Sequence, residues 1–230
     1  MRSALSQSGQ ETLPLAWEAF ARLLDHEREQ GPRAARQRLA GLRMAYLARR
    51  QETALPSLRG VSGDLAGELA RTRGVWALWM LRQRLGAHAW EQLDFEGAAP
   101  ISWEHLGEVA SRVGGAEIAR ALEFWVASDA LPDYRLERAS ARQQGEGFAV
   151  ALRIVNRGEG SVPVGVAIRT EEGALHELMM AALPGQRADA AYPVLTRPAA
   201  AAVDPHGALL MAEAERGWLA VSLRPRWWPF

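Results

Sequence analysis

The sequence predicts an α+β protein in which an α-helical bundle precedes a small antiparallel β-sandwich of the immunoglobulin type. From Glu11 to about Val126, apolar residues recur at the spacing of amphipathic helices. After Leu131-Pro132 the spacing changes to two, as in half-buried strands. Short apolar runs then alternate with Pro and Gly turn signals. We therefore expect a helical bundle in residues 1–131, a β-sandwich in residues 132–218, and an aromatic, arginine-containing tail in residues 219–230.

Glycine, proline and one serine mark the expected helix ends. A first helix ends at Gly31-Pro32, and an arginine-rich helix follows it. After a loop at residues 53–63, a third helix runs from Asp64 towards Gly86. Its segment VWALWML is apolar on all sides, which predicts a place at the centre of the bundle. Further helices are expected around Trp90, between Ser102 and Gly114-Gly115, and from Ile118 to Val126. The side chains expected in the core are Trp76, Trp79, Leu81 and Trp125.

The expected strands follow from alternation of apolar and small or polar residues. Residues 148–154 and 162–168 alternate in this way, and the glycines at residues 158 and 160 predict a hairpin turn between them. Shorter strands are expected at residues 175–182, 190–195 and 201–203, divided by Pro-Gly, Arg-Pro and Asp-Pro signals.

The composition excludes several kinds of chemistry. All 27 basic residues are arginine and there is no cysteine, so lysine Schiff bases, disulfides and thiolate metal sites are excluded. The net charge is zero, and we expect no nucleic-acid partner; the arginines of the second helix are interpreted as a solvated or partner-pairing face. The polar N-terminus and the lack of a long apolar run predict no signal peptide and no membrane span, so we expect a cytoplasmic protein.

The segment HEREQ, residues 26–30, looks like the zinc-protease signature H-E-x-x-H with its last histidine replaced. In that signature two histidines one helical turn apart bind zinc while the glutamate activates water. Gln30 is a poor zinc ligand, and the alternating charges around it are typical of a solvated helix face. We interpret the segment as a charged surface helix and not as a metal site.

Four longer segments carry a resemblance to a known family. They read AWEAFARLLDHEREQG from residue 16, RTRGVWALWMLRQRLGAHAWEQL from residue 71, ISWEHLGEVASRVGGAEIARALEFWVASDALPDYRL from residue 101, and AAVDPHGALL from residue 201. In their order and spacing they resemble the C-terminal portion of the gluzincin zinc aminopeptidases, the family of membrane alanyl aminopeptidase. The resemblance runs from about Leu13 to Leu210. It implies that Glu18 is equivalent to the third zinc ligand of the family.

The departures from the family are as informative as the matches. The N-terminal β-domain and the part containing H-E-x-x-H are absent, and Arg71 stands where the resemblance places the catalytic tyrosine. A catalytic zinc needs three protein ligands, and this chain offers one equivalent. Glu18 is then either a relic paired with a nearby arginine or turned to solvent, or a ligand whose two histidines come from another chain. We expect no cofactor, and zinc only if another chain completes the site.

Two apolar sets predict protein contacts. The missing domains would have covered the first helix, so Leu15, Trp17, Phe20 and Leu24 need another cover, from the chain's own termini, a second copy or a different protein. In the tail, Trp227, Trp228 and Phe230 stand beside arginine, the residue types that dominate binding hot spots; folding back onto the chain is the other reading. We expect a protein partner, with homodimerisation as the form most accessible to a lone chain.

The sequence therefore predicts a non-catalytic, zinc-aminopeptidase-like protein that acts as a binding or partner subunit. The alternative is the C-terminal half of a split zinc metallopeptidase whose H-E-x-x-H half lies on another chain. A fragment of a longer protein, or a decayed gene product, is the third reading.

Overall fold

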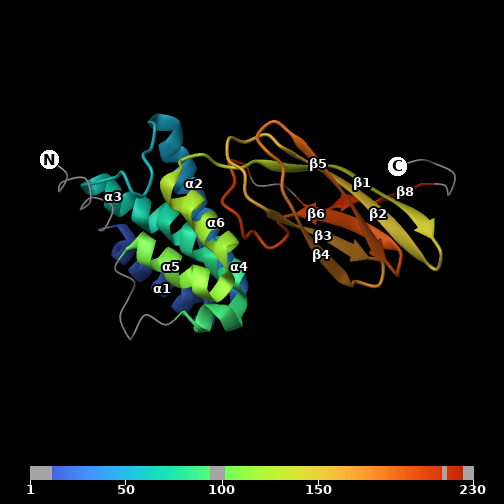
Figure 1. Ribbon diagram of the computed structural model, residues 1–230, viewed down its shortest axis with the longest axis horizontal. Helices are drawn as coiled ribbons and strands as arrows, with labels where there is room; N and C mark the ends of the chain where they lie inside the picture. The colour runs from blue at the N-terminus through green and yellow to red at the C-terminus, as the bar shows by residue number, and fades with distance from the viewer. Residues whose placement is uncertain (1–11, 94–101, 214–216, 225–230) are drawn as a thin grey trace. The chain divides into compact units, whose positions relative to one another are not determined.

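The structure is a computed structural model that describes residues 12–93, 102–213 and 217–224. The chain divides into two compact units, Met1–Asp129 and Ala130–Phe230. In the described residues the first unit is helical and the second is built of strands (Figure 1). The predicted α+β class is therefore confirmed.

The helices begin and end largely where glycine, proline and serine predicted. Helix α1 (Thr12–Gln30) is followed by α2 (Pro32–Glu52), which starts at its proline. The hydroxyl of Ser102 accepts a hydrogen bond from the backbone N–H of His105 at 3.1 Å and caps α5 (Trp103–Gly114). Helix α6 (Ala116–Ala127) follows directly and packs against α5.

The predicted third helix is less regular than its sequence indicates. It consists of α3 (Asp64–Leu69), a π-helical turn η1 (Ala70–Gly74) and α4 (Val75–Glu91), and its backbone leaves the helical conformation at Gly86, as the sequence predicted. The four side chains that we expected in the core, Trp76, Trp79, Leu81 and Trp125, are each at most 3% exposed. The apolar segment at the start of α4 is thus the centre of the helical unit.

Gly74 explains how η1 lies so close to α1. A Cβ atom added at Gly74 would lie 2.6 Å from the Cβ atom of Ala16, well inside the distance that real carbon atoms keep. A small residue on each side is therefore required where the two helices meet.

The strands form two four-stranded sheets. The first has the order β5-β2-β1-β8, from β5 (Arg187–Val194), β2 (Gly147–Asn156), β1 (Tyr134–Gln144) and β8 (Ser222–Arg224). The second has the order β4-β3-β6-β7, from β4 (Leu175–Met180), β3 (Val164–Thr170), β6 (Pro198–Val203) and β7 (Leu219–Ala220). Strand β1 of the first sheet contacts β6 of the second. Val150, Leu152 and Ile154 of β2 and Val166 and Ile168 of β3 are fully buried.

The sequence missed β1, and a β-bulge explains why. The register with β2 shifts between Leu136 and Arg138. The buried apolar residues are Tyr134 and Leu136 before the shift and Ala139 and Ala141 after it, so they change from even to odd numbers, and the polar Ser140 is buried as well. A bulge inserts one residue and reverses the alternation, which hides the period of two.

Two further expectations about the strands were wrong. The turn at residues 156–160 is not a hairpin, because β2 pairs with β1 and β5 while β3 pairs with β4 and β6, so the chain crosses here between sheets. The sheets are also not purely antiparallel, because β8 pairs with β1 in parallel. Residues 219–224, assigned to the tail from the sequence, supply β7 and β8.

A buried polar corner holds the crossover between the sheets. The side-chain oxygen of Asn156 accepts hydrogen bonds from the backbone N–H groups of Asp133 (3.1 Å) and Gly158 (3.0 Å). Its side-chain nitrogen donates to the carbonyl oxygens of Gly160 (2.7 Å) and Ala182 (3.0 Å). Asn156 is the only asparagine in the chain and is fully buried. A Cβ atom at Gly158 would lie 2.3 Å from a backbone oxygen, so this turn requires glycine.

Candidate functional site

Glu18, the residue equivalent to a zinc ligand in the resemblance, lies on the exposed side of α1. Its side chain is 60% exposed, and its carboxylate is paired with Arg22 one turn further along the helix. Of the two arrangements expected for a relic, pairing with an arginine and exposure to solvent, Glu18 has both. The described residues contain no group of three His, Cys, Asp or Glu side chains placed to hold a metal ion.

The HEREQ segment occupies the last turns of α1, and its glutamate makes an ion pair. Glu27 accepts a hydrogen bond from Arg82 of α4 at 2.7 Å, with both side chains largely buried. Asp25 pairs with Arg28 at 2.6 Å on the exposed surface. The glutamate that would activate water in a true H-E-x-x-H site therefore joins α1 to α4 here.

The apolar residues of α1 are covered in part by the chain itself. The indole of Trp17 stacks on that of Trp90 with ring centroids 6.0 Å apart, and Phe20 meets the same ring edge-on at 5.5 Å. Phe20 is 1% exposed, so it belongs to the core of the helical unit. Leu15, Trp17 and Leu24 are half-buried. The cover by Trp90 of α4 was not among those that the sequence had offered.

The tail residues of the predicted contact set, Trp227, Trp228 and Phe230, lie outside the described residues.

The π-helical turn η1 carries a buried arginine that the sequence did not single out. Arg73 is 1% exposed; its Nη1 donates to the Tyr46 hydroxyl at 2.8 Å and its Nε donates to the carbonyl of Trp125 at 3.1 Å. Burial lowers the pKa of the Arg73 guanidinium, and Tyr46 and Asp129 oppose this shift. The carbonyl of Trp125 belongs to the last turn of α6, whose negative end favours a cation. Through these two hydrogen bonds, Arg73 joins the C-terminal end of α6 to the buried centre of the helical unit.

Arg71, which stands where the resemblance places the catalytic tyrosine, is on the exposed side of the same turn. Its guanidinium donates to the carbonyl of Gly67 at 3.3 Å. A guanidinium differs from a phenolic hydroxyl in that it has donors and no hydrogen-bond acceptor.

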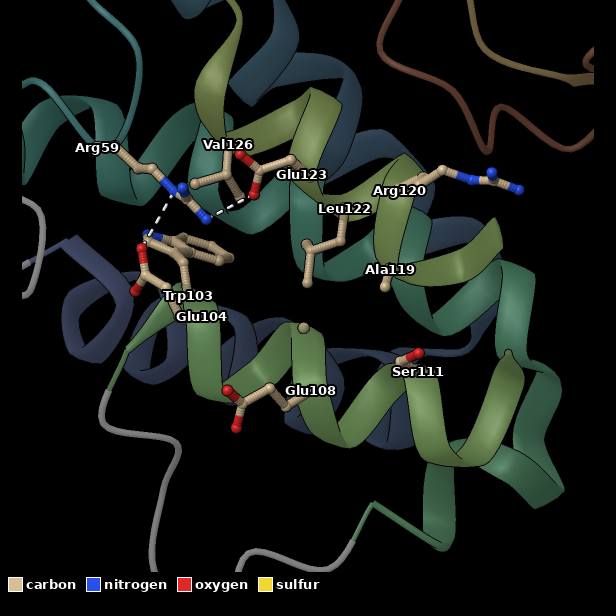
Figure 2. Close-up of a pocket in the computed structure, with 11 residues that line it drawn as sticks. Arg59, Trp103, Glu104, Glu108, Ser111, Ala119, Arg120, Leu122, Glu123 and Val126 are labelled. Carbon is tan, nitrogen blue, oxygen red and sulfur yellow. Dashed lines mark hydrogen bonds and ion pairs between the residues drawn. The ribbon is translucent and has the colours of Figure 1, made fainter. Parts of the chain in front are cut away.

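An open pocket of about 420 Å³ lies between α5 and α6 (Figure 2). Trp103, Leu122 and Val126 form its buried apolar part, and carboxylates from both helices lie at its rim. Arg59, from the loop before α3, reaches Glu104 of α5 at 3.3 Å and Glu123 of α6 at 2.5 Å. These ion pairs occupy Arg59 and hold the loop against both helices, so the pocket offers an apolar cleft with a charged rim and no evident catalytic pair.

No protein-family model and no curated protein matches this chain. Among solved structures, the chain is similar to the aminopeptidase A of Legionella pneumophila, whose crystal structure was determined in complex with aspartic acid, with a TM-score of 0.51 and 13% sequence identity. The match covers 91% of this chain and 24% of the Legionella chain, so this chain spans about a quarter of the length of that enzyme. Likeness at this level of identity concerns the fold alone: the chain has an aminopeptidase-like fold.

Proposed function

We propose that this chain is a non-catalytic relative of the gluzincin zinc aminopeptidases and that it acts by binding another protein. The observation that carries the proposal is the ion pair that the Glu18 carboxylate makes with Arg22 of its own helix. A carboxylate that serves as a zinc ligand is normally oriented by hydrogen bonds and faces its fellow ligands. Glu18 is instead bound to a cation of its own helix, and Arg71 stands where the resemblance places the catalytic tyrosine.

The finer description of the fold belongs to the same proposal. We assign the helical unit to the C-terminal half of an aminopeptidase catalytic domain, as a helical bundle, and the two four-stranded sheets to an immunoglobulin-like β-sandwich. The likeness to the Legionella enzyme over 91% of this chain supports the assignment. The buried hydroxyl of Tyr134 in β1 donates a hydrogen bond to the carbonyl of Val162, just before β3 of the other sheet, at 2.7 Å. Such sandwiches use a tyrosine contact of this kind at a corner between strands.

We propose that the half-buried edge of α1, with Leu15, Trp17 and Leu24, contacts the partner protein. The aromatic residues 227, 228 and 230 are a separate proposed contact set. Phe20 supports this edge from the core and does not take part directly, since it is 1% exposed.

Zinc analysis of the purified chain tests the loss of the metal site. We expect less than one zinc per chain after dialysis and no cleavage of aminoacyl-arylamides, because one carboxylate is too few ligands for a catalytic site. The matched pair is Glu18→Ala and Glu29→Ala; Glu29 is an exposed glutamate of the same helix. One tightly bound zinc that is lost in Glu18→Ala and kept in Glu29→Ala would overturn the proposal.

A split metallopeptidase is the second candidate, and the exposure of Glu18 favours it too. A 60% exposed carboxylate is accessible to histidines of another chain, and the ion pair with Arg22 lies at the surface, where such pairs are weak. A neighbouring gene that encodes an H-E-x-x-H half without this C-terminal part would supply the second chain. If the mixed chains bind zinc and cleave aminoacyl-arylamides, and Glu18→Ala abolishes both, the split enzyme replaces the non-catalytic reading.

A further inference from the structure

Helix α5 contains two glycines, and packing requires only one of them. A Cβ atom added at Gly114, at the end of the helix, would lie 2.5 Å from the side chain of Leu85 and 2.8 Å from that of Ile118. A Cβ atom added at Gly107, in the interior of the helix, would meet no atom within 4 Å. Glycine in a helix interior is less stable than alanine, so Gly107 costs stability without being needed for close packing. What Gly107 provides is open space, and that space belongs to the pocket between α5 and α6.

The pocket has the size and the lining of a small-molecule site. Its volume of about 420 Å³ lies within the range of about 300–1,000 Å³ that is usual for ligand pockets. Its apolar lining residues, Trp103, Leu122 and Val126, are each at most 3% exposed. Such sites combine apolar walls with a few polar groups that fix the orientation of the ligand. Here the polar groups are the charged side chains at the rim (Figure 2).

The indole of Trp103 is held in a fixed position in this lining. Its N–H donates a hydrogen bond to the hydroxyl of Thr12 at 2.9 Å, and that hydroxyl donates to the carbonyl of Leu58 at 3.1 Å. The polar atom of the indole is thus satisfied by the protein itself, and the ring offers carbon surface to a ligand. An aromatic ring held in this way favours a flat apolar ligand, which can stack against it, and it favours a cation near its face.

Carboxylates outnumber guanidinium groups among the side chains that line the pocket. They are Glu104 and Glu108 of α5 and Glu123 of α6, against Arg59 and Arg120. Arg59 is bound to two of the three carboxylates, at 3.3 Å to Glu104 and at 2.5 Å to Glu123. One guanidinium therefore neutralises two carboxylates only in part at this end of the pocket.

The remaining two charged side chains leave this balance negative. Arg120 is directed away from the pocket (Figure 2), and it lies 3.8 Å from the carboxylate of Glu117, which does not line the pocket. Glu108 is exposed and has no hydrogen-bond or ion-pair partner among the described residues. A cleft whose lining carries an excess of one charge attracts ligands of the opposite charge. The rim of this pocket therefore favours a cation.

We propose that the pocket between α5 and α6 binds a small organic cation with a flat apolar body, such as an arylalkylamine. The apolar body lies in the space beside Gly107, against Trp103 and Leu122. The cationic group lies at the rim, beside the carboxylate of Glu108. The inference goes beyond the proposed function and does not rest on it, since neither Glu18 nor the edge of α1 lines the pocket.

Calorimetric titration of the full chain with three indole compounds tests the class of ligand. Tryptamine, tryptophol and indole-3-propionate share one aromatic body and carry a positive charge, no charge and a negative charge. We expect tryptamine to bind with a dissociation constant of about 0.1–1 mM, as befits a small ligand in an open pocket. Tryptophol should bind severalfold more weakly, and indole-3-propionate should bind about tenfold or more weakly. No binding of tryptamine at millimolar concentration, or equal affinities for the three compounds, would overturn the proposal.

Filling the pocket tests its location. Gly107→Leu places a side chain in the open space and should weaken tryptamine binding by about tenfold or more. The matched control is Gly41→Leu in α2, where an added carbon also meets no atom within 4 Å but no pocket is lined, so the affinity should not change. Thermal unfolding monitors the fold, which leucine should not weaken at either position because it is the better helix former. Equal tryptamine binding by the two folded variants would show that the ligand binds elsewhere and would overturn the proposal.

Removing one carboxylate tests the charge at the rim and leaves the shape of the pocket almost unchanged. Glu108→Gln should weaken the binding of tryptamine severalfold and leave that of tryptophol unchanged, because only the cation interacts with the carboxylate charge. The matched control is Glu29→Gln, which changes another exposed helical glutamate without a partner among the described residues and should affect neither compound. Added salt should likewise weaken the binding of tryptamine more than that of tryptophol. The same affinity for tryptamine in Glu108→Gln and Glu29→Gln would contradict the role of the carboxylate and overturn the proposal.

Discussion

Asn156→Ala should destabilise the β-stranded unit more than any surface change. The side chain makes four hydrogen bonds and is fully buried. Its removal leaves the N–H groups of Asp133 and Gly158 and the carbonyl of Gly160 without these bonds, whereas the carbonyl of Ala182 keeps its bond from Ser161 at 2.9 Å. Two buried groups and one partly buried group, at about 1–3 kcal/mol each and reduced by local rearrangement, give an expected loss of about 3–5 kcal/mol. This is a large part of the stability of a typical domain.

The measurement must report on the sheets alone, because two units can unfold separately and a single midpoint would then mix them. Hydrogen exchange followed by mass spectrometry serves this purpose, with peptides from β2 and β3 as the probe and peptides from α4 as the internal reference. The matched control is Gln144→Ala, which removes a similar amide from an exposed end of β1. A loss below about 1 kcal/mol in Asn156→Ala would refute the account of this corner.

Asn156→Asp distinguishes hydrogen bonding from simple loss of volume. The introduced carboxyl keeps the two acceptor contacts, but it brings an oxygen against the carbonyls of Gly160 and Ala182. The protonated form can donate to one of them, so its folded-state pKa should lie above the unfolded value of about 3.9. The protonated carboxyl of the Asn156→Asp variant therefore stabilises the fold below the unfolded-state pKa, and this stabilisation is lost as the pH rises through the folded-state pKa. We expect Asn156→Asp to recover stability relative to wild type on acidification, whereas Asn156→Ala should not.

Two further changes test other contacts. Gly74→Ala should lower the free energy of unfolding of the helical unit by about 1–3 kcal/mol, because the added carbon collides with Ala16 of α1. Gly107→Ala, whose added carbon meets open space in α5, should raise this free energy by about 0.5–1 kcal/mol. Equal effects of the two variants in thermal unfolding would contradict the packing. Hydrogen bonds from Arg187 and Arg153 lower the pKa values of the Glu137 and Asp189 carboxyl groups. The stability that these two groups contribute is therefore present above their unfolded-state pKa values of about 4.5 and 3.8, and it is lost as the pH falls through the folded-state values. Acid unfolding of the double variant Glu137→Gln/Asp189→Asn, followed by circular dichroism, should therefore depend less on pH below about 5 than that of wild type.

The sequence by itself determined the features that depend on neighbouring residues. Gly31-Pro32 and Ser102 marked helix ends because a missing backbone donor and a capping hydroxyl act within one turn of the chain. The all-round apolar segment at residues 75–81 predicted the centre of the helical unit, because an element without a polar face can only be buried. The change of spacing after Leu131-Pro132 predicted that strands follow helices.

Only the tertiary structure decided the features in which distant segments meet. A bulge concealed β1, and the crossover at residues 156–160 looks like a hairpin unless the strand partners are known, since register and pairing are long-range properties. The sequence left open whether Glu18 is paired, exposed to solvent or a ligand, and it did not predict the burial of Phe20 against Trp90, because the surroundings of both residues come from elsewhere in the chain. A periodic pattern shows that a face is apolar, but it does not name the segment that covers it. Which segment packs on the apolar face depends on the packing of the whole unit.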